Sequence, residues 1–127
     1  METALDLEFV PRGAAVRTAR DATAVVDPEL TPARQEDLRL LVSEIVTNSV
    51  RHRDLDDEGW IRLRISCGDG CVRVEVHNPG TSISFERSAK AGALRESGWG
   101  MYLLEQIADR WGVTRNGTTC VWFEIDL

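Results

Sequence analysis

Hydrophobic and polar residues alternate in four stretches of the chain, with the period of two that is typical of strands with one solvent-exposed face. The four stretches are residues 5–9, 60–67, 71–78 and 119–125. The middle two flank the sequence Gly-Asp-Gly at 68–70, which is typical of the tight turn of a hairpin. We therefore predict a hairpin in the middle of the chain and one further strand near each end.

Two stretches in the first half of the chain place hydrophobic residues at helical spacing instead. Residues 14–26 predict a helix that stops at Asp27-Pro28, because the residue before a proline avoids helical angles. Thr31-Pro32 predicts the start of a second helix, because a hydroxyl can cap the first free N–H groups and proline fits the first turn. This central helix is expected to run to about His52.

The segment between the hairpin and the last strand begins irregularly. Residues 79–97 contain proline, glycine, several serines and charges of both signs. Loops of this length are usually lids, binding loops or disordered segments. A third helix with one apolar face is predicted from Met101 to Trp111, and Gly112 is expected to end it.

Together these elements predict an α+β fold, a two-layer sandwich of a mixed or antiparallel sheet with helices on one face. The 127 residues suit a single domain that spans positions 1–127. The other face of the sheet is expected to be open to water or to a partner. It would carry Arg62, Arg64, Arg73, His77 and Trp122.

Charge and composition narrow the classes of function. The net charge of −6 argues against direct nucleic-acid binding, because phosphate contacts need a basic face. No run approaches the ~18 apolar residues of a membrane span and no signal peptide is recognisable, so we expect a cytoplasmic protein without membrane contact. The three cysteines are expected to be reduced thiols, because Cys67 and Cys71 bracket the hairpin turn with no further ligands to complete a zinc set.

The central helix carries polar residues beside its apolar stripe. Glu44, Asn48 and His52 are four residues apart, which places them in one line along the helix. An amphipathic helix usually keeps its charges opposite the apolar side, so this line indicates either a site or an ordinary polar border. In the hairpin, Asn78 continues the inward row of alternate valines and is expected to meet Glu44 and Asn48.

A second candidate feature is Gly98-Trp99-Gly100, which opens the third helix directly after the irregular loop. Glycines let backbone approach a ligand closely, and the first N–H groups of a helix attract phosphate. Alone, Gly-x-Gly at a loop end is more often a simple helix boundary. It is neither the dinucleotide fingerprint, which needs a third glycine, nor a P-loop, which needs Gly-Lys-Ser/Thr.

The order of these features resembles the Bergerat-fold ATP-binding family, which includes gyrase, histidine kinases and MutL. Within it the chain is similar to the small anti-sigma-factor serine/threonine kinases and their single-domain actinobacterial relatives. The resemblance spans about residues 9–125 and is carried by the segments 43–52, 108–112 and 121–124.

The resemblance implies a role for each matching residue. Asn48 would ligate Mg²⁺ bridging the phosphates of ATP, and Glu44 would be the general base for a substrate hydroxyl. Residues 82–97 would form the ATP lid. The nucleotide would also contact Asn78, Gly80, Gly98, Gly100, Arg51 and Thr119. His52 is an alternative to Arg51 at the phosphates.

The chain departs from the family motif at the end of the hairpin. Where the family usually has Asp-x-Gly-x-Gly, this chain has Asn78, Gly80 and Ser82. The family's aspartate accepts a hydrogen bond from the adenine amino group. An amide still offers an acceptor and adds a donor, and the lost charge would cost about 1–2 kcal/mol, or roughly tenfold in affinity.

Two hypotheses about function follow from these residues. The first is an ATP-dependent protein serine/threonine kinase that acts as an anti-sigma factor, regulating transcription by binding a sigma factor and phosphorylating an anti-anti-sigma (STAS-type) partner. The alternative is a degenerate regulator that docks on its partners and binds ATP weakly or not at all. The detached catalytic domain of a histidine kinase is disfavoured, because no dimerising helix with a phospho-acceptor histidine precedes the domain. The open sheet face is a candidate surface for a homodimer.

Overall fold

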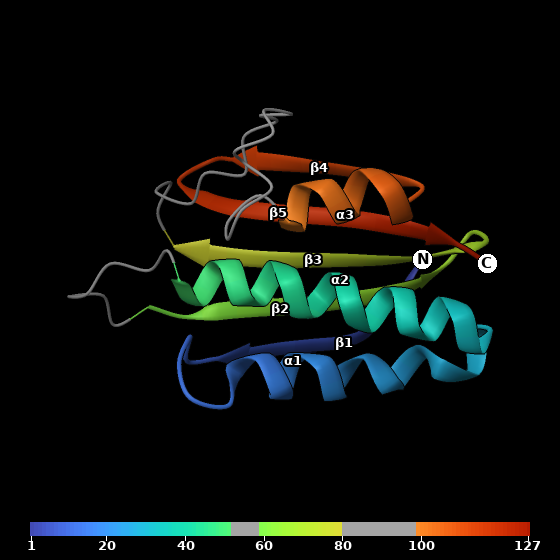
Figure 1. The fold of residues 1–127 in the computed structure, drawn as a ribbon, viewed down its shortest axis with the longest axis horizontal. Helices are drawn as coiled ribbons and strands as arrows, with labels where there is room; N and C mark the ends of the chain where they lie inside the picture. The colour runs from blue at the N-terminus through green and yellow to red at the C-terminus, as the bar shows by residue number, and fades with distance from the viewer. Residues whose placement is uncertain (52–58, 80–98) are drawn as a thin grey trace.

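A single antiparallel sheet carries three α-helices on one of its faces (Figure 1). The computed structural model describes residues 1–51, 59–79 and 99–127. In chain order the elements are β1 (Glu2–Phe9), α1 (Ala15–Ala22), the 3₁₀-helix η1 (Thr23–Glu29), α2 (Pro32–Arg51), β2 (Ile61–Gly68), β3 (Cys71–Pro79), α3 (Trp99–Ile107), β4 (Arg110–Arg115) and β5 (Thr118–Asp126). The predicted α+β sandwich is confirmed, and its sheet is antiparallel.

The strands lie in the order β1-β2-β3-β5-β4, each antiparallel to its neighbours. The predicted hairpin is β2–β3. Its two-residue loop has φ of 53° at Asp69 and 76° at Gly70. Positive φ at both positions is the requirement of a type I′ turn, which Asp-Gly satisfies at low cost. This local turn chemistry sets the register that places the hairpin's side chains.

Helix α2 is the middle element of the helical layer, between α1 and α3 (Figure 1). It begins where the sequence predicts, because the hydroxyl of Thr31 accepts a hydrogen bond from the Arg34 N–H at 3.3 Å. Its fully buried side chains are Leu38, Leu41, Val42, Ile45 and Val46. They form one core with the inward rows of the sheet, which include Leu63, Ile65, Val74, Val76, Val121 and Phe123. Each such side chain contributes roughly 1.5–3 kcal/mol by leaving water.

The first predicted helix ends earlier than expected. Helix α1 stops at Ala22, and η1 then continues through Pro28 to Glu29. The prediction of a helix over 14–26 that ends before the proline is therefore wrong at its C-terminal end. Thr23 begins the change by donating its hydroxyl to the Arg20 carbonyl at 2.7 Å. The β-branched residues that follow favour α-helix less, and the 3₁₀ turn still buries Val26.

The third predicted helix is also too long. Helix α3 ends at Ile107, and Trp111 and Gly112 belong to β4, which pairs with β5. The apolar spacing that indicated a helix continues by coincidence into a strand with a period of two. Trp111 and Val113 are partly buried against the core. Pairing with β5, which lies later in the chain, overrides the local helical pattern, and Gly112 therefore does not end a helix.

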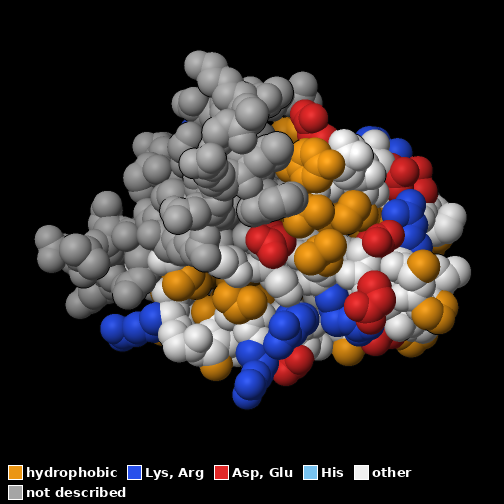
Figure 2. Space-filling view, viewed as in Figure 1, with side chains coloured by type: hydrophobic (Ala, Val, Ile, Leu, Met, Phe, Trp, Pro, Cys, Tyr) orange, Lys and Arg blue, Asp and Glu red, His pale blue; other side chains and the backbone are white. Residues whose placement is uncertain are grey.

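The face of the sheet away from the helices carries the polar residues that strand alternation assigns to it. Arg62 and Arg64 are exposed, whereas Arg73, His77 and Trp122 are half-buried. The Arg73 guanidinium lies 4.3 Å from the centre of the Trp122 ring, a cation–π contact. On the helical face, acidic and basic side chains are interspersed over the described residues (Figure 2).

Candidate functional site

Helix α2 and strand β3 end at the same end of the molecule, and strand β5 begins there, whereas helix α3 begins farther along the sheet (Figure 1). Asn48 lies in the last turn of α2, Asn78 next to the end of β3, and Thr119 near the start of β5. Asn78 and Thr119 are direct partners in the β3–β5 ladder. The β3–β5 ladder therefore brings together two polar residues that are 41 positions apart in the sequence.

These three polar side chains are buried. Asn48 is 4% exposed, Asn78 3% and Thr119 0%. Asn78 follows the fully buried Val74 and Val76 on the face of β3 that packs against the helices, as its position in the strand predicts. A buried polar group is costly unless it has a hydrogen-bond partner, so buried polar side chains at this end of the core require an explanation.

The Asn78 amide nitrogen has no hydrogen-bond partner within the described part of the chain. An unpaired buried donor costs roughly 1–3 kcal/mol. A side-chain amide also presents a donor and an acceptor side by side, which matches the edge of an adenine ring. The residue is therefore suited to a ligand that supplies the missing acceptor.

Glu44 lies one turn before Asn48 on α2 and is half-buried. Two neighbouring hydroxyl groups are used by the helix itself: Thr47 donates to the Ser43 carbonyl at 2.6 Å and Ser49 to the Ile45 carbonyl at 3.1 Å. These two hydroxyls are therefore occupied by backbone carbonyls of the same helix. The chemically versatile groups of this stretch are the Glu44 carboxylate and the Asn48 amide.

Several predicted site residues have no described side chain. Gly80, Ser82, Gly98, His52 and most of the loop 79–97 lie outside the described residues. Gly100 falls in the first turn of α3, which begins at Trp99, and Arg51 is the last residue of α2. The Arg51 side chain lies outside what the structure describes, and Gly100 has no side chain.

Sequence reasoning missed two groups of residues. Asp109, in the turn between α3 and β4, accepts hydrogen bonds from the Asp126 backbone N–H at 2.7 Å and from Arg34 at 3.0 Å, and so joins β5 to α2. Glu75, His77 and Cys120 cluster on the open sheet face. Strand parity indicates that these three share a face, but only the pairing of β3 with β5 brings them together.

Residues 9–125 match the family model of the histidine kinase-like ATPase domain. The chain belongs to this family. The match covers nearly all of the chain and confirms the resemblance expected from its motifs. None of the described helices is long and apolar enough to cross a membrane.

Relatives in this family include regulators and kinases. The chain is 34% identical over 85 residues to an anti-sigma F factor of Clostridium botulinum, covering 65% of this chain and 59% of that protein. It is 31% identical over 97 residues to the serine-protein kinase RsbW of Bacillus velezensis, covering 68% and 61%, respectively. The RsbW of Bacillus subtilis is 32% identical over 85 residues, covering 58% and 53%. The chain thus spans about three fifths of the length of these curated relatives, or less.

A solved structure shows the same fold. The catalytic domain of histidine kinase ThkA superposes with a TM-score of 0.57, covering 99% of this chain and 97% of that one, at 16% sequence identity. At this identity the likeness concerns the fold alone.

Proposed function

We propose that this chain is an ATP-dependent protein serine/threonine kinase that binds a sigma factor and phosphorylates an anti-anti-sigma protein of the STAS type. The observation that carries the proposal is the pair Glu44 and Asn48, one helical turn apart on α2, at the end of the molecule where Asn78 and Thr119 are buried. The names of the relatives, anti-sigma F factor and serine-protein kinase RsbW, support the choice of partners. We place this regulator in the cytoplasm.

The proposed adenine pocket is built on the β3–β5 ladder. Asn78 offers its N–H, which has no partner within the described residues, to a ring nitrogen of adenine and its oxygen to the exocyclic amino group. Thr119, its partner across the ladder, forms the neighbouring wall. Adenine would supply the hydrogen-bond acceptor that the buried Asn78 amide does not find among the described residues. Gly80, Gly98, Gly100 and Arg51 are proposed to contact the phosphates.

Asn48 is the proposed protein ligand for Mg²⁺. Its amide oxygen is the hard, neutral ligand that Mg²⁺ accepts beside water and phosphate. Bound Mg²⁺ supplies neutralisation of the phosphate charge. The side chain of Asn48 is 4% exposed and lies in the last turn of α2.

Glu44 is the proposed general base. Its carboxylate accepts the proton of a substrate serine or threonine hydroxyl as that oxygen attacks the γ-phosphate of ATP. Helix α2 positions this carboxylate one turn from the phosphate-side Asn48, so the acceptor of the proton and the phosphates are held by the same rigid element. In phosphoryl transfer such positioning provides most of the rate enhancement.

The test is transfer of label from γ-labelled ATP to a panel of STAS-type proteins in the presence of Mg²⁺. We expect the wild type to transfer label. In Glu44→Gln the rate of transfer should fall at least about a hundredfold, which is the range typical of a lost general base. Glu36→Gln is the matched control, because Glu36 lies on the same helix but is exposed far from this end. Wild-type protein that binds ATP but labels none of the panel would rule out the kinase.

A second function is favoured by two residues. Asn78 replaces the aspartate that the family uses for adenine, and Ser82 replaces a glycine. These substitutions support a regulator that docks on its partners with little or no nucleotide affinity. Calorimetric titration with ATP and Mg²⁺ separates the two proposals: a dissociation constant in the low micromolar range favours the kinase, and no measurable heat favours the docking protein.

A further inference from the structure

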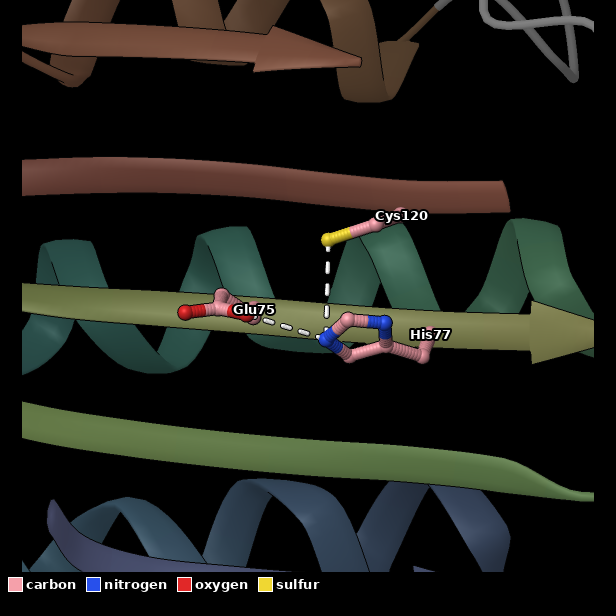
Figure 3. Close-up of side chains that lie close together, drawn as sticks. All are labelled: Glu75, His77 and Cys120. Atoms are coloured by element: carbon pink, nitrogen blue, oxygen red, sulfur yellow. Dashed lines mark hydrogen bonds and ion pairs between the residues drawn. The ribbon is translucent and has the colours of Figure 1, made fainter. Parts of the chain in front are cut away.

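Three different metal-ligating side chains converge on the open face of the sheet. Glu75 and His77 come from β3 and Cys120 from β5 (Figure 3). The imidazole Nε2 of His77 lies 3.0 Å from the Glu75 Oε1 and 3.6 Å from the Cys120 Sγ. The three ligand atoms all lie within 4.8 Å of one another. In Figure 3 they lie on the side of the strands away from α2, which is behind the sheet.

The strand geometry makes this meeting inevitable once β3 pairs with β5. His77 and Cys120 are direct partners in the ladder, and Glu75 is two residues before His77 on the same face. Asn78, the next residue, points to the helical face and into the proposed nucleotide pocket. The cluster is therefore separated from that pocket by the sheet itself.

We propose that Glu75, His77 and Cys120 bind a divalent transition-metal ion of the zinc type. An oxygen, a nitrogen and a sulfur ligand are the set that Zn²⁺ accepts, at about 2.0–2.2, 2.0–2.1 and 2.3 Å. In a tetrahedral site these lengths separate the ligand atoms by about 3.3–3.6 Å. The two measured separations, 3.0 and 3.6 Å, are close to these values.

The third separation also permits an ion. The Glu75 oxygen and the Cys120 sulfur are at most 4.8 Å apart, and even at that separation one point lies about 2.4 Å from all three ligand atoms. Small rotations of the side chains would bring the three atoms to coordination distance from an ion at that point. The charge of the ligands also matches that of a divalent ion. The Glu75 carboxylate and an ionised Cys120 thiolate together carry two negative charges, and the proton displaced from sulfur leaves to solvent.

Neighbouring residues orient the ligands. The Arg73 Nε donates to Glu75 Oε2 at 3.3 Å, which leaves Oε1 directed at His77. Arg73 is in turn held by Glu124 at 3.1 Å and by the face of Trp122. Metal sites commonly show such outer hydrogen bonds to a ligating carboxylate. The site is also accessible, because the side chains of Glu75 and His77 are 20% and 29% exposed. It therefore has three protein ligands and one position open to water.

A reactive thiol is the competing interpretation, and the surroundings of Cys120 disfavour it. A redox-sensing or nucleophilic cysteine needs a lowered pKa and exposure. Burial instead raises the pKa of the Cys120 thiol to about 11, and the charge of Glu75 acts in the same direction.

The test uses Co²⁺ as a spectroscopic substitute for Zn²⁺, added to the reduced, tag-free, full chain after treatment with chelator. We expect one equivalent of Co²⁺ to produce a sulfur-to-cobalt charge-transfer band and the intense visible bands of tetrahedral cobalt, and Zn²⁺ to displace both. Cys120→Ser should abolish the charge-transfer band, whereas Cys71→Ser, at a buried cysteine outside the cluster, should retain it. Glu75→Gln and His77→Gln should weaken binding about tenfold or more. His52→Gln, at the chain's other histidine, should not.

Circular dichroism in the presence of chelator shows whether each variant folds, and Glu75→Gln keeps the test decisive if Cys120→Ser does not fold. Binding of cobalt without a sulfur charge-transfer band, no binding at all, or a band that survives Cys120→Ser would overturn the proposal. None of these measurements depends on nucleotide or kinase activity.

Discussion

Asn78 and Thr119 lie directly opposite each other in the β3–β5 ladder, and both side chains are buried at the end of the core. The pair lies at the point where the hydrophobic rows of both strands turn polar. We propose that one substitution relative to the family motif, asparagine for aspartate at this position, sets nucleotide affinity without changing the fold.

Asn78→Asp should tighten ATP binding about tenfold, because the charge-assisted hydrogen bond that its carboxylate accepts from the adenine amino group outweighs the loss of the amide N–H bond to the ring nitrogen. Asn78→Leu should abolish ATP binding. It should leave the melting temperature of the free protein unchanged or raised, because it removes a buried donor that has no partner among the described residues. Calorimetric titration and thermal unfolding measure the two effects. Equal ATP affinity in the wild type and in Asn78→Leu would show that Asn78 does not contact the nucleotide.

Asp109→Ala should lower the free energy of unfolding by about 1–2 kcal/mol, because Asp109 holds both the Asp126 N–H and Arg34 and is only one-third exposed. Asp37→Ala is the matched control. Asp37 pairs with the same arginine and is 34% exposed, against 32% for Asp109, but it makes an i,i+3 pair within α2. We expect its loss to cost less than about 0.5 kcal/mol. Urea unfolding with an unchanged m value is the measurement, and equal losses in the two variants would contradict the account.

Gly112→Ala should destabilise the protein by about 1–3 kcal/mol, the usual cost of overpacking. A Cβ at Gly112 would stand 2.8 Å from the Trp122 Nε1, so the indole must move and leave its place beneath Arg73. Tryptophan fluorescence should shift accordingly. In a Trp122→Leu background the same substitution should cost less, and a double-mutant cycle of denaturation measurements gives the difference. An additive cycle would refute the steric explanation.

As the pH falls, the free energy of unfolding should decline more steeply in the wild type than in the variant Arg110→Gln. Hydrogen bonds from Arg110 hold the pKa of the Glu124 and Asp126 carboxyls below their usual range. A lowered folded-state pKa contributes stability that is fully present above the unfolded pKa, about 4, and is lost as the pH falls through the folded value. The free energy of unfolding should therefore decline between about pH 5 and pH 3, and less so in the variant.

Urea unfolding across that range, in chelator, checks this prediction. Arg110→Lys serves as control, because it keeps the charge but not the guanidinium geometry, and should show an intermediate slope. High salt should reduce the differences, because the pairs are near the surface. Identical pH profiles for the wild type and Arg110→Gln would disprove the contribution of this arginine.

Much of the fold could be predicted from the sequence where local chemistry decides it. The Asp69-Gly70 turn, the start of α2 at Thr31-Pro32 and the inward direction of Asn78 depend on residues close together in the chain. The family resemblance rested on the motif segments 43–52, 108–112 and 121–124, and it is confirmed by the family match over residues 9–125. The assigned roles of Glu44, Asn48 and the glycines remain predictions.

Tertiary structure decided what depends on pairing between distant segments. A helical pattern continued into Trp111, but pairing with β5 makes that residue part of a strand. His77 and Cys120 are 43 residues apart in the sequence, and only the register of β3 against β5 makes them neighbours and completes a potential metal site with Glu75. Sequence period tells which face a side chain occupies, whereas strand order and register tell which side chains share that face. That difference explains why Asn78 was recognised from the sequence and the cluster behind it was not.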